Sequence, residues 1–289
     1  METTVFFTLD VDPSFPWRSD IQGLKEFLNY LRYVRYKTDF VCEMNITGYA
    51  LIQISKASQP LLDQLRGLIK AKVIEIGNHG YSHRPLCPTE TNFNLGRYMK
   101  GRNIFRYLNT VIRNPQTTSN IKNSLHYAMN LFLKKPKLLD KKEIIKEVNM
   151  TNKLIEGVFG NPPEAFRAPF FSTSQEVSEV IREEGIRYDL SSYIRAKGNK
   201  LQAVIPRIVR EGKGRIYEIA TSAKLDPEPW IENIATYKPG LLPPGLTVIV
   251  VHPWEFSFAY TQSNTVKQRF SQLLKETDRF VLSEEAVKL

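Results

Sequence analysis

Short apolar runs and longer segments of helical period alternate along the 289-residue chain. Residues 5–9 form a nearly continuous apolar run, as expected for a strand that is buried on both faces. Within residues 21–34, by contrast, Leu24 and Leu28 belong to a set of apolar side chains that recurs at the spacing of one helix face. The chain therefore predicts an α/β protein, because strands that alternate with helices build parallel sheets covered by helices.

The same patterns continue to the C-terminus. Further strands are predicted at residues 39–44, 73–76, 165–167, 186–190, 216–219, 247–251 and 279–282, and further helices at residues 60–71, 142–159, 174–184 and 265–276. This series of strands, with helices between most of them, favours a closed or nearly closed β/α barrel over an open doubly wound sheet. The length suits a single domain over residues 1–289 that carries an insertion at residues 87–139.

Reactive side chains gather where the predicted strands end. They are Asp10, Asp12, His79, Arg167, Asp189 and His252. The carboxyl ends of parallel strands meet at one face of a barrel or one edge of a sheet, which is where the active sites of these architectures lie. We therefore expect these side chains to share one site.

Two of the four histidines stand in the segment HGYSH, which runs from His79 to His83 directly after a predicted strand. Histidines at i and i+4 can bind one ion if the turn between them is helical, and imidazole suits zinc. The alternative is a pair of surface or capping histidines. The acidic pair favours the metal site, because Asp10 and Asp12 leave the first strand together and a cation would relieve their repulsion. Asp12 with both histidines makes the two-nitrogen, one-oxygen set of a catalytic zinc site.

Two later strand ends complete a hydrolytic set. They supply the segment RAPFF, which begins at Arg167, and the segment HPWE, which begins at His252. A metal, a carboxylate base, a cation that holds this base and a histidine acid can together hydrolyse an amide.

In order and spacing, these motifs resemble those of the polysaccharide deacetylase family (NodB-homology domain, carbohydrate esterase type) over nearly the whole chain, apart from residues 87–139. The segment EIGNHGYSH, which ends at His83, carries the most specific likeness. The resemblance implies a distorted (β/α)7 barrel that removes N- or O-acetyl groups from glycans. Val11 separates the two aspartates, as in a subgroup that includes enzymes opening cyclic amides. Hydrolysis of a non-sugar amide is therefore the alternative to N-deacetylation of an amino sugar.

The resemblance also implies roles for single residues. Asp10 would be the general base that activates water, with Arg167 paired to it, and His252 would protonate the leaving amine. The backbone N–H of Phe170, where the family usually has tyrosine, would stabilise the oxyanion, and Asp189, in a loosely matching motif, would orient His252. A divalent metal, zinc first and cobalt, nickel, manganese or iron as alternatives, would be held by Asp12, His79 and His83.

Aromatic residues near these motifs are candidates for a platform under a sugar ring, and the alternative is that they pack the mouth of the barrel. They are Trp17, Tyr81, Phe171 and Trp254.

Residues 87–139 hold most of the formal charge of +10, with nine lysines and arginines against one acidic residue, Glu90. Apolar residues at helical spacing, over 104–112 and over 121–132, predict two helices beside the site. They form either a cap with solvated charges or a basic lid. Such a lid would receive a phosphate-linked sugar, on a nucleotide or lipid carrier, or contact an anionic membrane surface. Without a recognition motif, nucleic acid is not an expected partner.

The composition, with 42% hydrophobic and 24% charged residues, is that of a globular protein. Cys42 and Cys87 are too few for a disulfide framework, and the first residues do not resemble a signal peptide, so we expect a cytoplasmic protein. Two other classes remain open. A binding module that has lost catalysis would not need Asp10, Arg167 and His252 together, whereas a non-haem iron oxygenase could use the same metal ligands.

Overall fold

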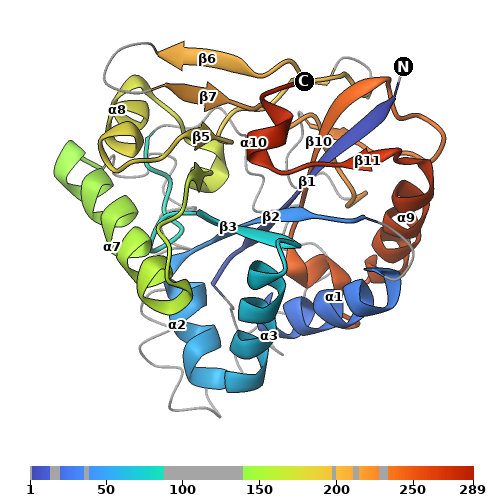
Figure 1. Ribbon diagram of the computed structural model, residues 1–289, viewed down its shortest axis with the longest axis horizontal. Helices are drawn as coiled ribbons and strands as arrows, with labels where there is room; N and C mark the ends of the chain where they lie inside the picture. The colour runs from blue at the N-terminus through green and yellow to red at the C-terminus, as the bar shows by residue number, and fades with distance from the viewer. Residues whose placement is uncertain are drawn as a thin grey trace.

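The computed structural model describes residues 2–13, 20–35, 39–87, 139–196, 200–210, 215–227 and 234–289. These residues form an 11-stranded sheet that curls strongly into a half-barrel, with helices along its outer side (Figure 1). The strand order is β6-β7-β5-β4-β3-β2-β1-β10-β8-β9, and β11 pairs with β1. The predicted α/β fold with a barrel-like sheet is thereby confirmed.

The longest strands stand at the centre of the sheet. They are β1 (Thr3–Val11), β2 (Cys42–Ile46), β3 (Ile74–Asn78) and β10 (Gly245–Val251). The shorter strands are β4 (Ala165–Phe166), β5 (Tyr188–Asp189), β6 (Arg207–Arg210), β7 (Ile216–Glu218), β8 (Ala223–Lys224), β9 (Ala235–Thr236) and β11 (Arg279–Phe280). Among the described strands, all pairings are parallel except that of β6 with β7. The residues that follow β1, β3, β4 and β10 therefore meet at one edge of the half-barrel.

Helices cover the convex side of the sheet. They are α1 (Asp20–Arg35), α2 (Gly48–Ala57), α3 (Gln59–Lys70), α7 (Lys141–Phe159), α8 (Gln175–Glu183) and α9 (Ser263–Glu276). The short helix α10 (Ser283–Ala286) lies instead within the curl of the sheet, where Ala286 packs in one core with Phe6 (Figure 1). The 3-10 helices η2 (Pro169–Phe171) and η3 (Pro253–Phe256) follow β4 and β10. Phe7 of β1 packs against Phe27 of α1 and Phe270 of α9, with ring centroids 6.2 and 5.0 Å apart. This aromatic cluster is the centre of the largest core and joins α1 and α9 to the sheet.

The side chains of β1 alternate between the two faces of the sheet, so that residues of the core under the helices lie on one face and the polar residues of the site lie on the other. Val5, Phe7 and Leu9 belong to the core under the helices, whereas Phe6 packs in a second core with residues of β10 such as Val248. Since side chains of a strand alternate between its two faces, the even-numbered residues of β1 point to the concave side of the sheet. The same side of the strand carries Thr8 and Asp10 toward the edge where β1 ends.

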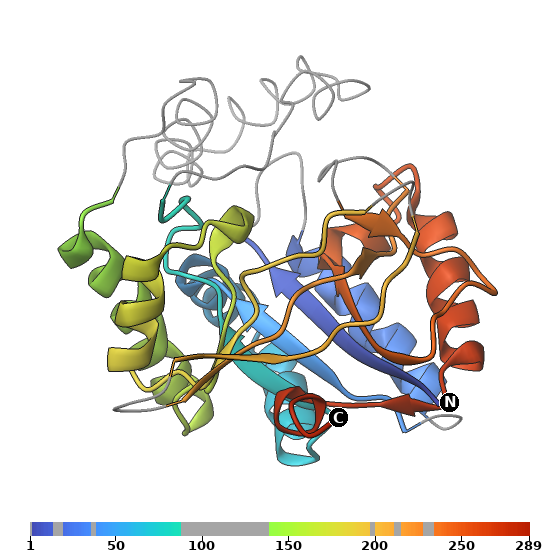
Figure 2. The same ribbon diagram turned by 90° about the horizontal axis from the view of Figure 1, so that it is seen from above.

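Most predicted elements are found within a few residues of their expected bounds, and the differences have a local cause. The strand predicted at residues 39–44 begins at Cys42, and α2 (Gly48–Ala57) was not predicted at all. The strands β6, β8 and β9 and the helix α10 were also missed, because segments of two to four residues show no clear period. Both chain termini lie at the end of the half-barrel where the parallel strands begin, opposite the strand ends that carry the polar residues (Figure 2).

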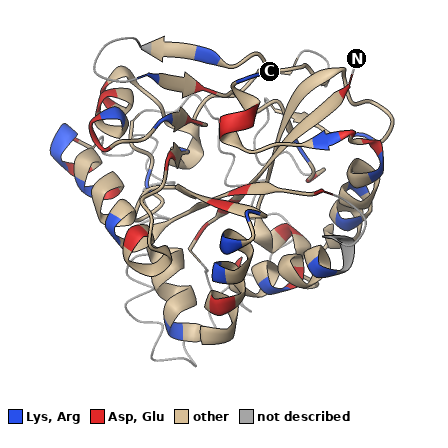
Figure 3. Cartoon of the chain, viewed as in Figure 1, with Lys and Arg blue, Asp and Glu red and all other residues tan. Residues whose placement is uncertain are grey.

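Residues 88–138, with the predicted helices of the basic insertion, lie outside the described residues. In the rest of the chain, basic and acidic residues nearly balance, and Figure 3 shows both kinds interspersed along outer helices such as α7. None of the described helices is long and apolar enough to cross a membrane. Cys42 and Cys87 are both buried and free.

Candidate metal centre and its surroundings

Asp10 and Asp12 lie at the end of β1 on its concave side. They are two residues apart, so the pleat of the strand places both carboxylates on the same face. Their exposed fractions are 3% and 1%. Two carboxylates that are this close and this deeply buried require positive charge nearby, because desolvation and mutual repulsion both disfavour them. Different groups of the protein supply this positive charge to the two aspartates.

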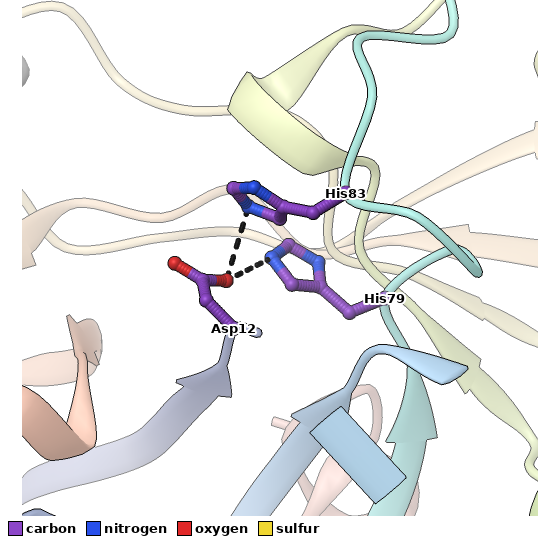
Figure 4. A group of neighbouring side chains, drawn as sticks. All are labelled: Asp12, His79 and His83. Atoms are coloured by element: carbon purple, nitrogen blue, oxygen red, sulfur yellow. Dashed lines mark ion pairs between the residues drawn. The ribbon is translucent and has the colours of Figure 1, made fainter. Parts of the chain in front are cut away.

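Asp12 faces the two histidines that follow β3. Its Oδ1 atom lies 3.4 Å from Nε2 of His79 and 3.0 Å from Nε2 of His83 (Figure 4). One ligand atom from each of the three residues lies within 4.8 Å of the others. Two ligand atoms that share a tetrahedral zinc ion, at about 2.1 Å from it, stand roughly 3.4 Å apart. The three buried side chains therefore fit a divalent metal ion.

A backbone carbonyl oxygen determines the tautomer of His79. Its Nδ1 atom lies 2.6 Å from the carbonyl oxygen of Arg167. A carbonyl can only accept, so Nδ1 carries the hydrogen and donates it, which leaves the Nε2 lone pair directed toward Asp12. Burial acts to lower the pKa of His79, but Asp10, Asp12 and the Arg167 carbonyl outweigh it and raise this pKa. The position thus favours positive charge, as a metal site should.

The segment from His79 to His83 is not helical, contrary to the condition assumed from the i and i+4 spacing. Instead, Gly80 has φ = +73° and His83 has φ = +57°. A side chain at Gly80 would be strained at this φ and crowded, because a Cβ would stand 3.3 Å from the ring of Pro169. Two left-handed residues, rather than a helical turn, bring both imidazoles to Asp12.

Arg167, directly after β4, is fully buried at 0% exposure and holds Asp10. Its Nη1 atom donates to Oδ1 of Asp10 at 2.8 Å and to Oγ1 of Thr8 at 2.8 Å. The amide of Asn45 donates to the same Asp10 oxygen at 3.2 Å. The second oxygen, Oδ2, lies 4.0 Å from Nε2 of His79. Asp10 is therefore bonded on one oxygen and faces the metal site with the other.

His252, directly after β10, lies on the other side of Asp12. Its Nε2 atom is 3.8 Å from Oδ2 of Asp12. Its Nδ1 atom lies 2.9 Å from Oε1 of Glu255, which is fully buried and also accepts the backbone N–H of His252 at 3.2 Å. Asp189 was expected to orient His252, and Glu255 was not among the expected site residues. The feature of the sequence that could have identified Glu255 is its position three residues after His252, in the HPWE segment.

Asp189, at the end of β5, makes different contacts. One of its oxygens accepts the backbone N–H of Ser191 at 2.9 Å. Burial raises the pKa of Asp189 to about 6, against the hydrogen bonds from Ser191 and with a contribution from Glu218. The expected role of Asp189 in orienting His252 stays a prediction, whereas Glu255 contacts Nδ1 of that histidine.

Phe170 lies beside the histidines, at φ = +59°. Its ring centroid is 4.8 Å from that of His83. A non-glycine residue in the left-handed region carries strain, which is found preferentially at functional sites. The expected oxyanion role of its N–H stays a prediction.

The aromatic residues expected near the sugar are mostly packed. Trp254 is 5% exposed and packs edge-on against Tyr260 at 4.7 Å. Phe171 is 8% exposed and lies under the guanidinium of Arg167 at 5.6 Å. Tyr81 is half-buried and packs on Tyr49 at 4.8 Å. These contacts favour packing at the mouth of the half-barrel over an open platform. Trp17 lies outside the described residues.

A sequence model described as glycosyl hydrolase family 57 matches residues 21–220. The chain belongs to glycosyl hydrolase family 57. The matched region of the family 57 chain contains His79, His83 and Arg167, but neither Asp12 nor His252. No curated protein matches the chain significantly.

Solved structures resemble this family 57 chain at low sequence identity. The 4-α-glucanotransferase from Thermococcus litoralis superposes with a TM-score of 0.60 at 13% identity, over 99% of this chain and 38% of that one. A candidate polysaccharide deacetylase from Mycobacterium smegmatis gives 0.56 at 14% identity, over 98% and 88%. A CE4 family pseudoenzyme from Bacillus anthracis gives 0.51 at 13% identity, over 99% and 66%.

These likenesses concern the fold alone. They include both the polysaccharide deacetylases expected from the motifs and a glucanotransferase, of which this chain spans much less than two thirds. The expected likeness to polysaccharide deacetylases is thus confirmed at the level of the fold, whereas the family shown by sequence is glycosyl hydrolase family 57.

Proposed function

We propose that this protein is a metal-dependent hydrolase that removes an N-acetyl group from an amino sugar or a glycan. The observation that carries the proposal is the buried set Asp12, His79 and His83, whose ligand atoms lie within 4.8 Å of one another. A divalent ion, zinc in the first place, fits two imidazoles and one carboxylate. When bound, it would supply a Lewis acid that polarises the acetyl carbonyl and makes water more acidic.

The protein side chains around this set supply the proton transfers. Asp10 accepts the proton of the attacking water on Oδ2, the oxygen that faces the site, while Arg167 holds Oδ1 in place. His252 then donates a proton from Nε2 to the nitrogen that leaves the acetyl group. Glu255 at Nδ1 fixes the orientation of this ring, as carboxylates do behind catalytic histidines. The positions of the three groups thus match a base, its anchor and an acid.

Cleavage of a glycosidic bond is the second candidate, and membership of glycosyl hydrolase family 57 favours it. That reaction needs two carboxyl groups, one of them protonated to act as an acid. Asp10 is held by a guanidinium and Asp12 by two histidines, and both surroundings stabilise a negative charge. The geometry therefore supports amide hydrolysis better, with hydrolysis of a non-sugar amide as its variant.

One experiment separates these reactions. The purified protein would be analysed for bound metals and then screened with N-acetylated oligosaccharides and with free, nucleotide-linked and lipid-linked N-acetyl sugars, with acetate and new reducing ends measured together. We expect acetate without new reducing ends. Reducing ends without acetate would establish the glycosidase instead. Asp12→Ala and His79→Ala should lose metal and activity together, whereas Asp63→Ala, at an exposed position, should keep both. If the first two variants kept both, the proposal would fail.

The basic insertion suggests which sugars to include. A cytoplasmic deacetylase with a basic lid over residues 87–139 would favour a sugar that carries phosphate, from a nucleotide or a lipid carrier. Because that contact is between charges, salt should raise the Michaelis constant for such a substrate and leave that for the free sugar unchanged. An equal effect of salt on both would remove this part of the proposal.

A further inference from the structure

Glu147 of α7 is a buried carboxylate beside the histidine segment that lies outside the metal-ligand set and the proton-transfer groups. It is 4% exposed. Its Oε2 atom accepts the backbone N–H of Tyr81 at 3.0 Å and that of Ser82 at 2.7 Å. Its Oε1 atom accepts the Ser82 hydroxyl at 2.8 Å and a guanidinium N–H of Arg84 at 2.8 Å. Four donors thus bind one carboxylate, and all of them belong to residues 81–84.

A buried carboxylate is tolerated when its oxygens are fully hydrogen-bonded. Here all the hydrogen bonds to Glu147 come from one short segment, because the donors lie between His79 and His83 and directly after His83. Two of them are backbone N–H groups, so Glu147 constrains the path of the chain as well as its side chains. The segment it constrains contains Gly80 and His83, both in the left-handed region. A left-handed conformation at a non-glycine residue is strained, and it is kept only where surrounding contacts hold the backbone in place.

The same helix also holds the start of the segment. The amide group of Asn78 donates to the carbonyl of Val148 at 2.9 Å and to the side chain of Asn152 at 2.7 Å. The oxygen of Asn78 accepts the N–H of Gly80 at 2.7 Å. Consecutive turns of α7 therefore bind residues on both sides of His79. The helix acts as a template against which the metal-binding segment is folded.

We propose that Glu147 is a positioning residue that sets the spacing of His79 and His83 for the metal ion. This inference rests on the proposed metal centre and goes beyond it, since it assigns the geometry of that centre to a helix that contributes no ligand. Groups that orient metal ligands typically affect metal affinity about 10- to 100-fold when they are removed.

The test compares Glu147→Gln with Glu156→Gln, an exposed glutamate on the same helix. Cobalt(II) is added to the metal-free full chain, its affinity is measured by competition with a chelator, and its visible absorption reports the coordination geometry. We expect Glu147→Gln to weaken cobalt binding about 10- to 100-fold and to change the spectrum. Glu156→Gln should match the wild type in both.

The outcomes separate positioning from stability alone. If Glu147→Gln lowered the melting temperature but kept the wild-type cobalt affinity and spectrum, the inference would be overturned. If that variant did not fold, Ser82→Ala, which removes one donor to Glu147, would be measured instead, with a smaller loss of affinity expected and no loss overturning the inference. A wild type that binds no cobalt would overturn both this inference and the metal centre. Weakened cobalt binding in Glu147→Gln, with no acetate released by the wild type, would support the inference and overturn the proposed reaction alone.

Discussion

Replacing Arg167 by methionine should destabilise the protein strongly, and replacing Asp10 at the same time should cost less than the two single changes together. The guanidinium is fully buried and lies 2.8 Å from Oδ1 of Asp10. At an effective dielectric constant of about 20, two unit charges at this distance attract by about 6 kcal/mol. Removing one partner of a buried ion pair typically costs about 3 to 5 kcal/mol, because the other charge stays behind unpaired.

The double variant will not return to wild-type stability. Arg167 also donates to the carbonyl of Leu190 at 3.1 Å and to the hydroxyl of Thr221 at 3.2 Å, and these acceptors lose their partner in either background. The quantity to measure is therefore the coupling energy of a double-mutant cycle with Arg167→Met and Asp10→Asn, in which such losses cancel. We expect a coupling of about 2 to 5 kcal/mol, somewhat below the Coulomb value, because the charges are delocalised over several atoms.

The assay is urea unfolding with a chelator present, so that no bound metal contributes. The matched control is the surface pair Arg187–Glu164, at 3.1 Å with side chains 52% and 58% exposed. A cycle of Arg187→Met and Glu164→Gln should give less than about 1 kcal/mol. A coupling for Arg167 and Asp10 as small as that of the surface pair would refute the reasoning.

Three further outcomes are expected. Asp12→Ala should lose the added stability that zinc confers on the wild type, about 4 kcal/mol at a zinc concentration 1,000 times the Kd, as measured by unfolding with and without zinc. Glu255→Gln should lower kcat for acetate release roughly 10- to 100-fold, part of the 10²–10⁴ that a general acid supplies, with little change in KM, because His252 loses its orienting carboxylate. Burial, with a smaller contribution from the charge of Glu75, raises the pKa of Glu43 to about 8. Since the folded protein then holds a proton that the unfolded chain releases, stability should fall as pH rises from about 4.5 to 8, and Glu43→Gln should flatten this fall in urea unfolding curves.

Each of these outcomes has a control and a contradicting result. Asp63→Ala should retain the full zinc effect, and an equal effect in Asp12→Ala would exclude that aspartate as a ligand. An unchanged kcat in Glu255→Gln, beside the exposed control Glu285→Gln, would show that the carboxylate does not act on His252. For Glu43→Gln, a pH dependence identical to that of the wild type would assign the fall in stability to other groups.

Local sequence patterns predicted several residues of the site. The apolar run at residues 5–9 predicted a buried strand, and Asp10 and Asp12 were expected to leave its end together, where the structure buries both of them. The position of His79 directly after a strand placed it at the same edge. These inferences succeeded because the period of a strand and the common direction of parallel strands follow from backbone geometry alone.

Glu147 and Glu255 show where such inference stops. Glu147 lies 66 positions along the chain from Tyr81, whose N–H it accepts, and nothing in its local sequence distinguishes it from other glutamates of an amphipathic helix. Glu255 is near His252, but a spacing of three residues does not say which ring nitrogen it reaches. Both contacts depend on how a segment packs against the sheet.

The amino-acid sequence by itself determined most of the longer elements, their order, and the edge of the sheet at which Asp12, His79 and His83 would meet, because periodicity and strand ends are local properties. The tertiary structure alone decided which groups hold those side chains. Arg167 reaches Asp10 across 157 positions of sequence, its carbonyl sets the tautomer of His79, and α7 supports the left-handed segment that ends at His83. Such contacts come from the packing of distant segments in a dry interior, where a charged or polar group must find a partner.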